Sequence, residues 1–148
     1  MNDAVREDAL DASEVALWRT YLAWTRAVTA QVEAALLSSS GLSASDFAIL
    51  VRLHEDGGAM QQAALQASTT WSASRLSHQL RRMERRDLIA RAGVGVGRAV
   101  LVELRPEGAR ALAGAVHPHA IAVREHFLDH LTAEQRAILM QIMSPDTD

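Results

Sequence analysis

The chain has 148 residues, of which 49% are hydrophobic, a formal net charge of −3 and no cysteine. This length and apolar content suit one domain with a sizeable core and exclude a disordered chain. The absence of cysteine excludes disulfides, Cys-ligated zinc and thiol catalysis. No apolar run reaches the length of a membrane span and the polar start has no signal-peptide pattern, so we expect a cytoplasmic protein with no membrane partner.

The first long segment predicts a helix with an unusually wide apolar face. Residues 1–12 are expected to form a loose tail, and residues 13–148 a single domain. From about residue 13 to residue 38 helix-forming residues run without Pro or Gly, and apolar side chains cover roughly half of the circumference. Part of this face is therefore expected to meet another subunit or a ligand, the alternative being a helix buried in its own core.

A well-marked helix start follows the run of serines and glycine at 38–41. Ser43 with Asp46 three residues later resembles a capping box, and Leu42 with Phe47 stands at the spacing of a hydrophobic staple. A short third segment is predicted at about 59–68, before a turn. This order of helix, turn and longer basic helix is typical of a helix-turn-helix.

Residues 72–86 predict the basic helix itself. Ser72 is a suitable N-cap, and Leu76, Leu80 and Met83 form a narrow apolar face. Arg and Gln are the side chains that reach base edges in the major groove, and Arg also neutralises phosphate. Five long polar side chains fall in a sector about 100° wide and are expected to point outwards: Arg75, His78, Gln79, Arg82 and Arg86.

The charge distribution favours a polyanionic partner for this helix. Residues 75–98 carry seven Arg and two acidic residues, a net +5, whereas the rest of the chain carries eight Arg and sixteen acidic residues, a net −8. The alternative is a solvated helix face stabilised by pairs such as Arg81 with Glu84. Such faces usually mix both signs, so the basic island favours nucleic acid.

A β-hairpin is predicted directly after the basic helix. Residues 88–91 and 98–104 are strand-like, and three glycines alternate along the tip between them. Arg98, at the base of the tip, is expected to enter the adjacent minor groove or to meet phosphate. A glycine-rich phosphate cradle is not favoured, because no helix begins directly behind the tip.

Two further helices are predicted after the hairpin. Pro106 suits a first helical position, Pro118 is expected to break or kink the helix, and Thr132 with Gln135 forms a capping box for a last helix that Pro145 ends. The expected fold is mainly α with a small β-hairpin wing. It is a winged helix-turn-helix flanked by terminal helices.

No metal, cofactor or catalytic site is predicted. His126 and His130 stand at i and i+4 and would share a face with His119 on a continuous helix, a spacing that can hold a metal ion. Exposed or interfacial histidines are the favoured alternative, since no Cys and no fixed carboxylate accompany them. The sequence has no nucleophile elbow, paired carboxylates or HExxH string, so we do not expect an enzyme.

The order of elements and the string from Trp71 to Ile89 resemble the MarR family of bacterial transcriptional regulators over residues 13–143. The resemblance implies a homodimer in which residues 13–41 and 105–143 supply interlocking dimerisation helices. It implies that residues 42–104 form the unit that binds one half of a pseudo-palindromic operator in double-stranded DNA. It also implies a set of DNA-facing residues, with a wing arginine last: Ser72, Ser74, Arg75, His78, Gln79, Arg82 and Arg98.

The chain departs from the family pattern in the wing, where Gly95-Val96-Gly97 replaces the Asp that many relatives carry before the wing arginine. The family usually answers small aromatic effectors, so the resemblance implies a ligand-responsive repressor. The alternative function is a winged-helix protein-interaction or dimerisation module without specific DNA binding. Five residues are expected as effector-pocket wall, core packing being the alternative: Trp18, Tyr21, Trp24, Phe47 and His54.

Overall fold

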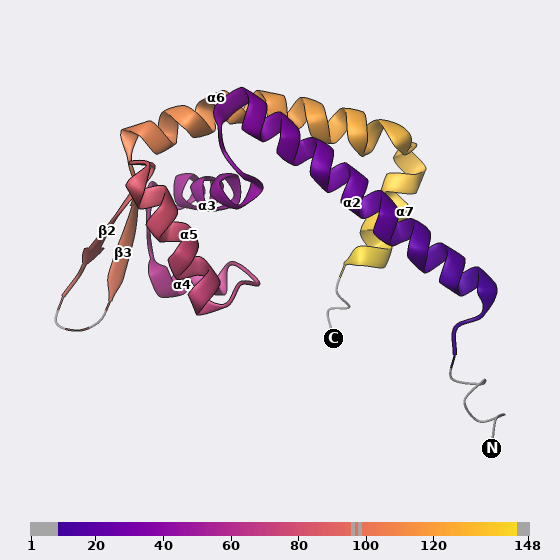
Figure 1. The fold of residues 1–148 in the computed structure, drawn as a ribbon, viewed down its shortest axis with the longest axis horizontal. Coiled ribbons are helices and arrows are strands. Elements are labelled where there is room, and N and C mark those ends of the chain that lie inside the picture. The colour runs from indigo at the N-terminus through magenta and orange to yellow at the C-terminus, as the bar shows by residue number, and fades with distance from the viewer. Residues whose placement is uncertain (1–8, 96, 98, 145–148) are drawn as a thin grey trace, which may run out of the picture.

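The computed structural model describes residues 9–95, 97 and 99–144 and confirms a mainly helical fold with a small antiparallel sheet (Figure 1). The predicted Arg98 and Pro145 features lie outside the described residues. The elements in chain order are α2 (Ala12–Ser40), α3 (Ala44–Glu55), β1 (Ala59–Gln61), α4 (Gln62–Ala67), α5 (Ala73–Arg85), β2 (Ile89–Gly93), β3 (Val100–Leu104), α6 (Pro106–His126), the 3-10 helix η1 (Leu128–His130) and α7 (Ala133–Met143).

The long helices α2 and α6 lie side by side. The helices α3, α4 and α5 and the hairpin form a group at one end of them (Figure 1). α2 begins at a capping box in which Asp11 and Glu14 exchange hydrogen bonds with each other's backbone N–H. It ends at Gly41, whose φ of 68° is left-handed and therefore suits glycine. Both ends agree with the predicted helix to within a few residues.

The predicted capping box of α3 is confirmed. The backbone N–H of Asp46 donates to Ser43 Oγ at 3.1 Å, and the backbone N–H of Ser43 donates to Asp46 Oδ2 at 2.9 Å. α3 then carries its apolar side into the main core, which also takes in α5, both hairpin strands and the end of α2. The largest fully buried apolar side chains of this core are Leu36, Leu42, Ile49, Leu50, Leu53, Leu65, Leu76, Leu80, Met83, Ile89 and Val102.

The sheet has one strand more than the sequence predicted. The hairpin strands β2 and β3 are paired from Ile89 with Leu104 to Gly93 with Val100. β1 pairs with the other edge of β3, so the strand order is β1-β3-β2. The prediction of a single segment over 59–68 was wrong at its start, because residues 59–61 form a strand whose partner lies some forty residues further along the chain.

Pro118 does not break α6, which runs from Pro106 to His126 without interruption. The hydrogen bond that Pro118 cannot donate would go to the carbonyl of Gly114, and Gly114 is exposed, so water can satisfy that carbonyl. The predicted capping box of α7 is confirmed between Thr132 and Gln135. Within the described residues no single helix is long and apolar enough to cross a membrane, and only α2 with α3, bent by 73° at their junction, would meet that test as a pair.

Candidate nucleic-acid interface

α5 is held by its apolar face and offers the opposite face to solvent. Ser72 Oγ accepts the backbone N–H of Arg75 at 3.2 Å and so caps the helix, as predicted. Leu76, Leu80 and Met83 are fully buried. Ser74 and His78 lie on the exposed face, as expected of side chains available to a partner.

Arg75 stands at the start of this exposed face. Its guanidinium carbon lies 4.4 Å from the centroid of the Trp71 ring, and the Trp71 side chain packs against the main core. A cation over an indole face is attracted by the ring quadrupole, so the stack restricts where the guanidinium can go. Arg75 is therefore both exposed and oriented.

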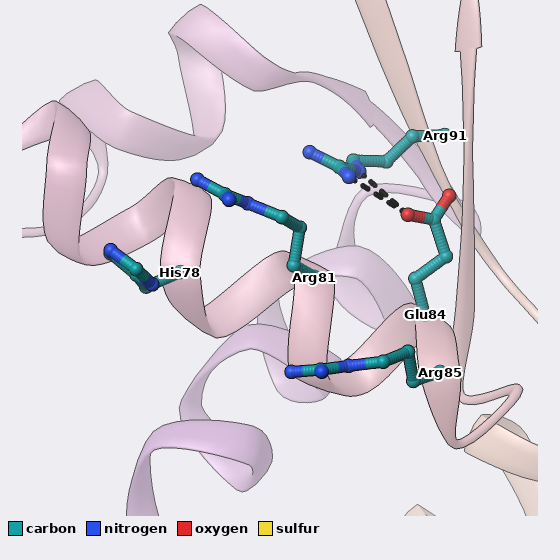
Figure 2. Close-up of a pocket in the computed structure, with 5 residues that line it drawn as sticks. All are labelled: His78, Arg81, Glu84, Arg85 and Arg91. Atoms are coloured by element: carbon teal, nitrogen blue, oxygen red, sulfur yellow. Dashed lines mark hydrogen bonds and ion pairs between the residues drawn. The ribbon is translucent and has the colours of Figure 1, made fainter.

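An open cleft of about 540 Å³ lies between α5 and β2, lined by His78, Arg81, Glu84, Arg85 and Arg91. Figure 2 shows Arg81 and Arg85 extending from α5 to the same side, with Glu84 turned towards Arg91. Arg91 donates to Glu84 Oε2 from Nη2 at 2.8 Å and from Nε at 3.2 Å. These hydrogen bonds lower the pKa of Glu84 below its ordinary value. The cleft therefore holds one carboxylate, already paired, and an excess of cations.

Arg81 and Arg85 were not among the predicted DNA-facing residues. Both are exposed, and both lie across α5 from its buried side. The signal was in the sequence, because the centre of an exposed helix face lies opposite the apolar residues, here Leu76 and Met83. The predicted stripe was drawn too close to that apolar face.

The expectation that Gln79 points outwards was wrong. Gln79 is 2% exposed, and its Nε2 donates to Asp46 Oδ1 at 2.6 Å. Gln79 follows Leu76 by three residues and precedes Met83 by four, so the helix carries it onto the buried side. Its partner Asp46, at the start of α3, is equally buried.

Two more members of the predicted stripe have partners within the protein. Arg82 is exposed, but its Nη2 donates to Gln79 Oε1. Arg86 donates from Nη1 to Asp46 Oδ2 at 2.7 Å and from Nη2 to the Gly41 carbonyl at 2.8 Å, which turns its guanidinium towards the end of α2. Arg86 is thus occupied in holding helices together, and a DNA contact by it is a weaker prediction than one by Arg82.

Within a single chain, the five predicted effector residues do not line one common pocket. Trp18 and Tyr21 stack at a centroid distance of 5.6 Å on the outside of α2, Trp24 meets Phe127 at 5.4 Å, and Phe47 stacks on His119 at 4.5 Å. The fifth, His54, is exposed at the end of α3. Effector binding by these residues stays a prediction.

The histidines of the C-terminal half are not gathered into a metal site. α6 ends at His126, and His130 belongs to the separate turn η1, so the two do not share one continuous helix. Within the described ranges no group of three or more His, Cys, Asp or Glu side chains could hold a metal ion. His119 lies partly buried against Phe47, and this burial lowers its pKa.

The helices α3, α4 and α5 are followed directly by the hairpin β2–β3, so the chain is a winged helix-turn-helix protein. Its basic helix is α5. The terminal helices α2, α6 and α7 lie outside this unit (Figure 1).

Comparison with known proteins identifies the family. AbsC, a MarR family transcriptional regulator from Streptomyces coelicolor, is 34% identical, covers 93% of each chain and superposes with a TM-score of 0.86. The chain therefore belongs to the MarR family of transcriptional regulators, as the resemblance had implied. Sco3205, a MarR family regulator from the same organism crystallised with DNA, is 28% identical over 91% of this chain and 86% of that one, with a TM-score of 0.86.

Three other comparisons concern a structural neighbour, a family model and the curated proteins. A regulator described as organohalide sensing, RdhR-CbdbA1625 in its 2,4-dichlorophenol-bound form, shares the fold with a TM-score of 0.80 at 20% identity, over 92% of this chain and 79% of that one. A family model described as a domain of unknown function, DUF7343, matches residues 42–105, from two residues before α3 to one residue after β3. A search among curated proteins gives no match.

Proposed function

We propose that this protein is a sequence-specific DNA-binding transcriptional regulator that reads its operator with the exposed face of α5. The observation that carries the proposal is the accumulation of exposed arginines on that face, in a chain whose remaining parts are acidic. A relative 28% identical to the chain was crystallised with DNA, which supports the same partner here. We also propose that the protein has no catalytic activity and that it is located in the cytoplasm.

The exposed face divides into two regions with different tasks. Near the start of α5, Ser72, Ser74 and Arg75 would enter the major groove first, since the leading residues of a recognition helix meet the base edges. Further along, Arg81 and Arg85 line the cleft against β2 and suit the phosphates of one strand. His78 lies between the two regions. Arg82 lies on the same face of α5. Arg98 in the wing would enter the adjacent minor groove of the DNA.

We propose that the functional unit is a homodimer. Large apolar side chains are exposed along the terminal helices, including Leu17 at 73%, Ile142 at 71% and Met140 at 65%. So much exposed apolar surface outside the DNA-reading unit is explained by a second copy of the chain. Residues 13–41 and 105–143 would then be the dimerisation helices, and residues 42–104 the DNA-reading unit. Two recognition helices about one DNA turn apart would meet a pseudo-palindrome.

We further propose that the regulator is a ligand-responsive repressor. A hollow of about 460 Å³ beside the start of α2 is lined by Leu10, Glu14, Leu17, Trp18 and Tyr21, and this largely apolar wall suits a small aromatic molecule. An effector held by the dimerisation helices would change the separation of the two recognition helices. Operator affinity would then fall, because both half-sites must be met together.

Selection of bound sequences from random duplex DNA, followed by a salt titration on the recovered site, tests the proposal. We expect a pseudo-palindrome and an affinity that falls steeply with salt, because each neutralised phosphate adds about 0.9 to the log–log slope. Recovery of no preferred sequence would instead support the alternative, a winged-helix interaction module. Sedimentation of the free protein tests the dimer separately, and a monomer at micromolar concentration would contradict it.

A further inference from the structure

We propose that Asp46 and Gln79 are positioning residues that fix the guanidinium of Arg82 on the DNA-reading face, although neither of them touches DNA. The inference rests on the proposed function, since it names how one reading side chain is held. It replaces the expectation that Gln79 itself reads a base. Three residues from two helices form the relay: Asp46 from α3, with Gln79 and Arg82 from α5.

The relay begins at a buried carboxylate with three partners. The side chain of Asp46 is 3% exposed. Its Oδ1 accepts from Gln79 Nε2 at 2.6 Å, and its Oδ2 accepts from the backbone N–H of Ser43 at 2.9 Å and from Arg86 Nη1 at 2.7 Å. A buried carboxylate without such donors would be costly, so these three bonds hold Asp46 in one orientation.

The chemistry of the two neighbours then decides which way the Gln79 amide faces. An ionised carboxylate can only accept hydrogen bonds, and a guanidinium can only donate them. Gln79 therefore has to present its NH₂ group to Asp46 and its oxygen to Arg82, which is the arrangement observed. A rotated amide would place oxygen against the Asp46 carboxylate and NH₂ against the Arg82 guanidinium, losing both bonds.

Arg82 is the one member of the relay that reaches the surface. It is exposed, whereas Gln79 is 2% exposed. The buried Asp46 carboxylate therefore fixes Gln79, and Gln79 in turn fixes the solvent-facing guanidinium of Arg82. A long arginine side chain loses conformational entropy when it binds, and a side chain already held in place loses less. Arg82 should accordingly bind DNA more tightly than an exposed arginine for which the described residues provide no such hydrogen bond, for example Arg81, the preceding residue of α5.

A double-mutant cycle on operator binding tests the relay. We expect Gln79→Met to weaken binding about threefold to tenfold, the usual effect of losing one hydrogen bond. In an Arg82→Ala background the same change should have less than a twofold effect, since Gln79 acts through Arg82. In an Arg81→Ala background its effect should stay undiminished, which makes Arg81→Ala the matched control. Equal effects of Gln79→Met in both backgrounds would overturn the proposal.

A second readout separates positioning from stability. If Arg82 meets phosphate, Gln79→Met should flatten the salt dependence of binding by part of the slope that Arg82→Ala removes. If Arg82 reads a base, both variants should relax selection at the same operator position. A merely destabilised protein would keep both the slope and the base preference. Failure of the wild-type protein to select any sequence would count against the proposed function and is seen before any variant is made.

The relay can also be observed in the wild-type protein without any substitution. Arginine guanidinium nitrogens held by hydrogen bonds rotate slowly and give separate NMR signals, whereas those of free arginines are averaged. We expect separate Nη signals for Arg82 and Arg86, assigned by Arg82→Lys and Arg86→Lys, and averaged signals for Arg81. Averaged signals for Arg82 in the folded protein would overturn the proposal even if Gln79→Met failed to fold.

Discussion

A β-carbon on Gly108 would lie 2.1 Å from the carbonyl oxygen of Leu88. Gly108 is buried in the first turn of α6, and the same Leu88 oxygen accepts the backbone N–H of Arg105 at 3.0 Å. The obstacle is backbone, so it cannot be relieved by rotating a side chain. This contact seats the start of α6 against the junction between α5 and β2. Close approach of two backbones, and not a turn, is why glycine is needed here.

Gly108→Ala should therefore destabilise the protein, by about 1–3 kcal/mol as is typical of overpacking. The measurement is urea unfolding followed by circular dichroism. Gly114→Ala is the matched control in the same helix, because a β-carbon there meets no described atom within 4 Å. It should stabilise the protein by about 0.5–1 kcal/mol through helix propensity. Equal effects of the two changes would show that the Leu88 contact does not constrain the fold.

Arg81→Ala and Arg85→Ala should each weaken operator binding, although neither was expected from the sequence to face DNA. Both are exposed beside the cleft against β2, and a phosphate contact there would make each loss reduce the salt slope by about one. Fluorescence anisotropy at several salt concentrations provides the measurement. Arg124→Ala, which removes an exposed arginine from α6 instead, should leave the slope unchanged. A slope unaffected by either cleft variant would place the DNA elsewhere.

Features that depend on neighbouring residues were predicted best from the sequence. The capping boxes at Ser43 and Thr132 were predicted and are present, because a cap depends on residues only three apart. β1 was missed, because residues 59–61 become a strand only through pairing with β3.

The candidate site shows the same division between local and distant causes. That α5 is basic on one face could be predicted from periodicity, but the partners of its side chains could not. Gln79 is paired with a carboxylate 33 positions earlier and Arg86 with the same carboxylate 40 positions earlier. The local sequence does not reveal that a polar side chain at the edge of an apolar face has a hydrogen-bond partner on another helix. Arg81 and Arg85, by contrast, follow from the helix geometry alone once the centre of the buried face is located correctly.

Glu84→Gln should strengthen non-specific DNA binding. Glu84 is the only carboxylate that lines the cleft in the described part of the chain, and it holds Arg91 through two hydrogen bonds. Removing its charge leaves the cleft more positive, so affinity for random duplex DNA at low salt should rise about twofold to fivefold, equivalent to less than about 1 kcal/mol.

Stability should scarcely change in Glu84→Gln, because partly exposed ion pairs contribute about 0–1 kcal/mol. Arg91→Ala is the complementary variant, since it frees Glu84 instead of removing it. It should weaken binding to the same random duplex. If both variants shifted the affinity in the same direction, the charge of the cleft would not be the cause.

His119 should make the stability of the protein depend on pH in a defined window. Burial against Phe47 lowers the pKa of His119 from its ordinary value of 6.5, so the folded protein favours the neutral imidazole. Above pH 6.5 both folded and unfolded chains hold it neutral, and its contribution is fully present. As the pH falls below 6.5 the unfolded chain takes up a proton before the folded one does, so stability is lost towards the lower folded pKa.

His119→Leu isolates this contribution, because it keeps an apolar side chain against Phe47 and removes the titrating group. We expect the free energy of unfolding of the wild-type protein to fall more steeply than that of His119→Leu between pH 6.5 and pH 5, by up to about 1.4 kcal/mol per pH unit for one proton. His117→Leu, at an exposed position two residues earlier in α6, is the matched control and should keep the wild-type slope. Urea unfolding at half-unit pH steps measures all three. Parallel curves for the wild type and His119→Leu would mean that His119 is solvated in the folded protein as freely as in the unfolded chain.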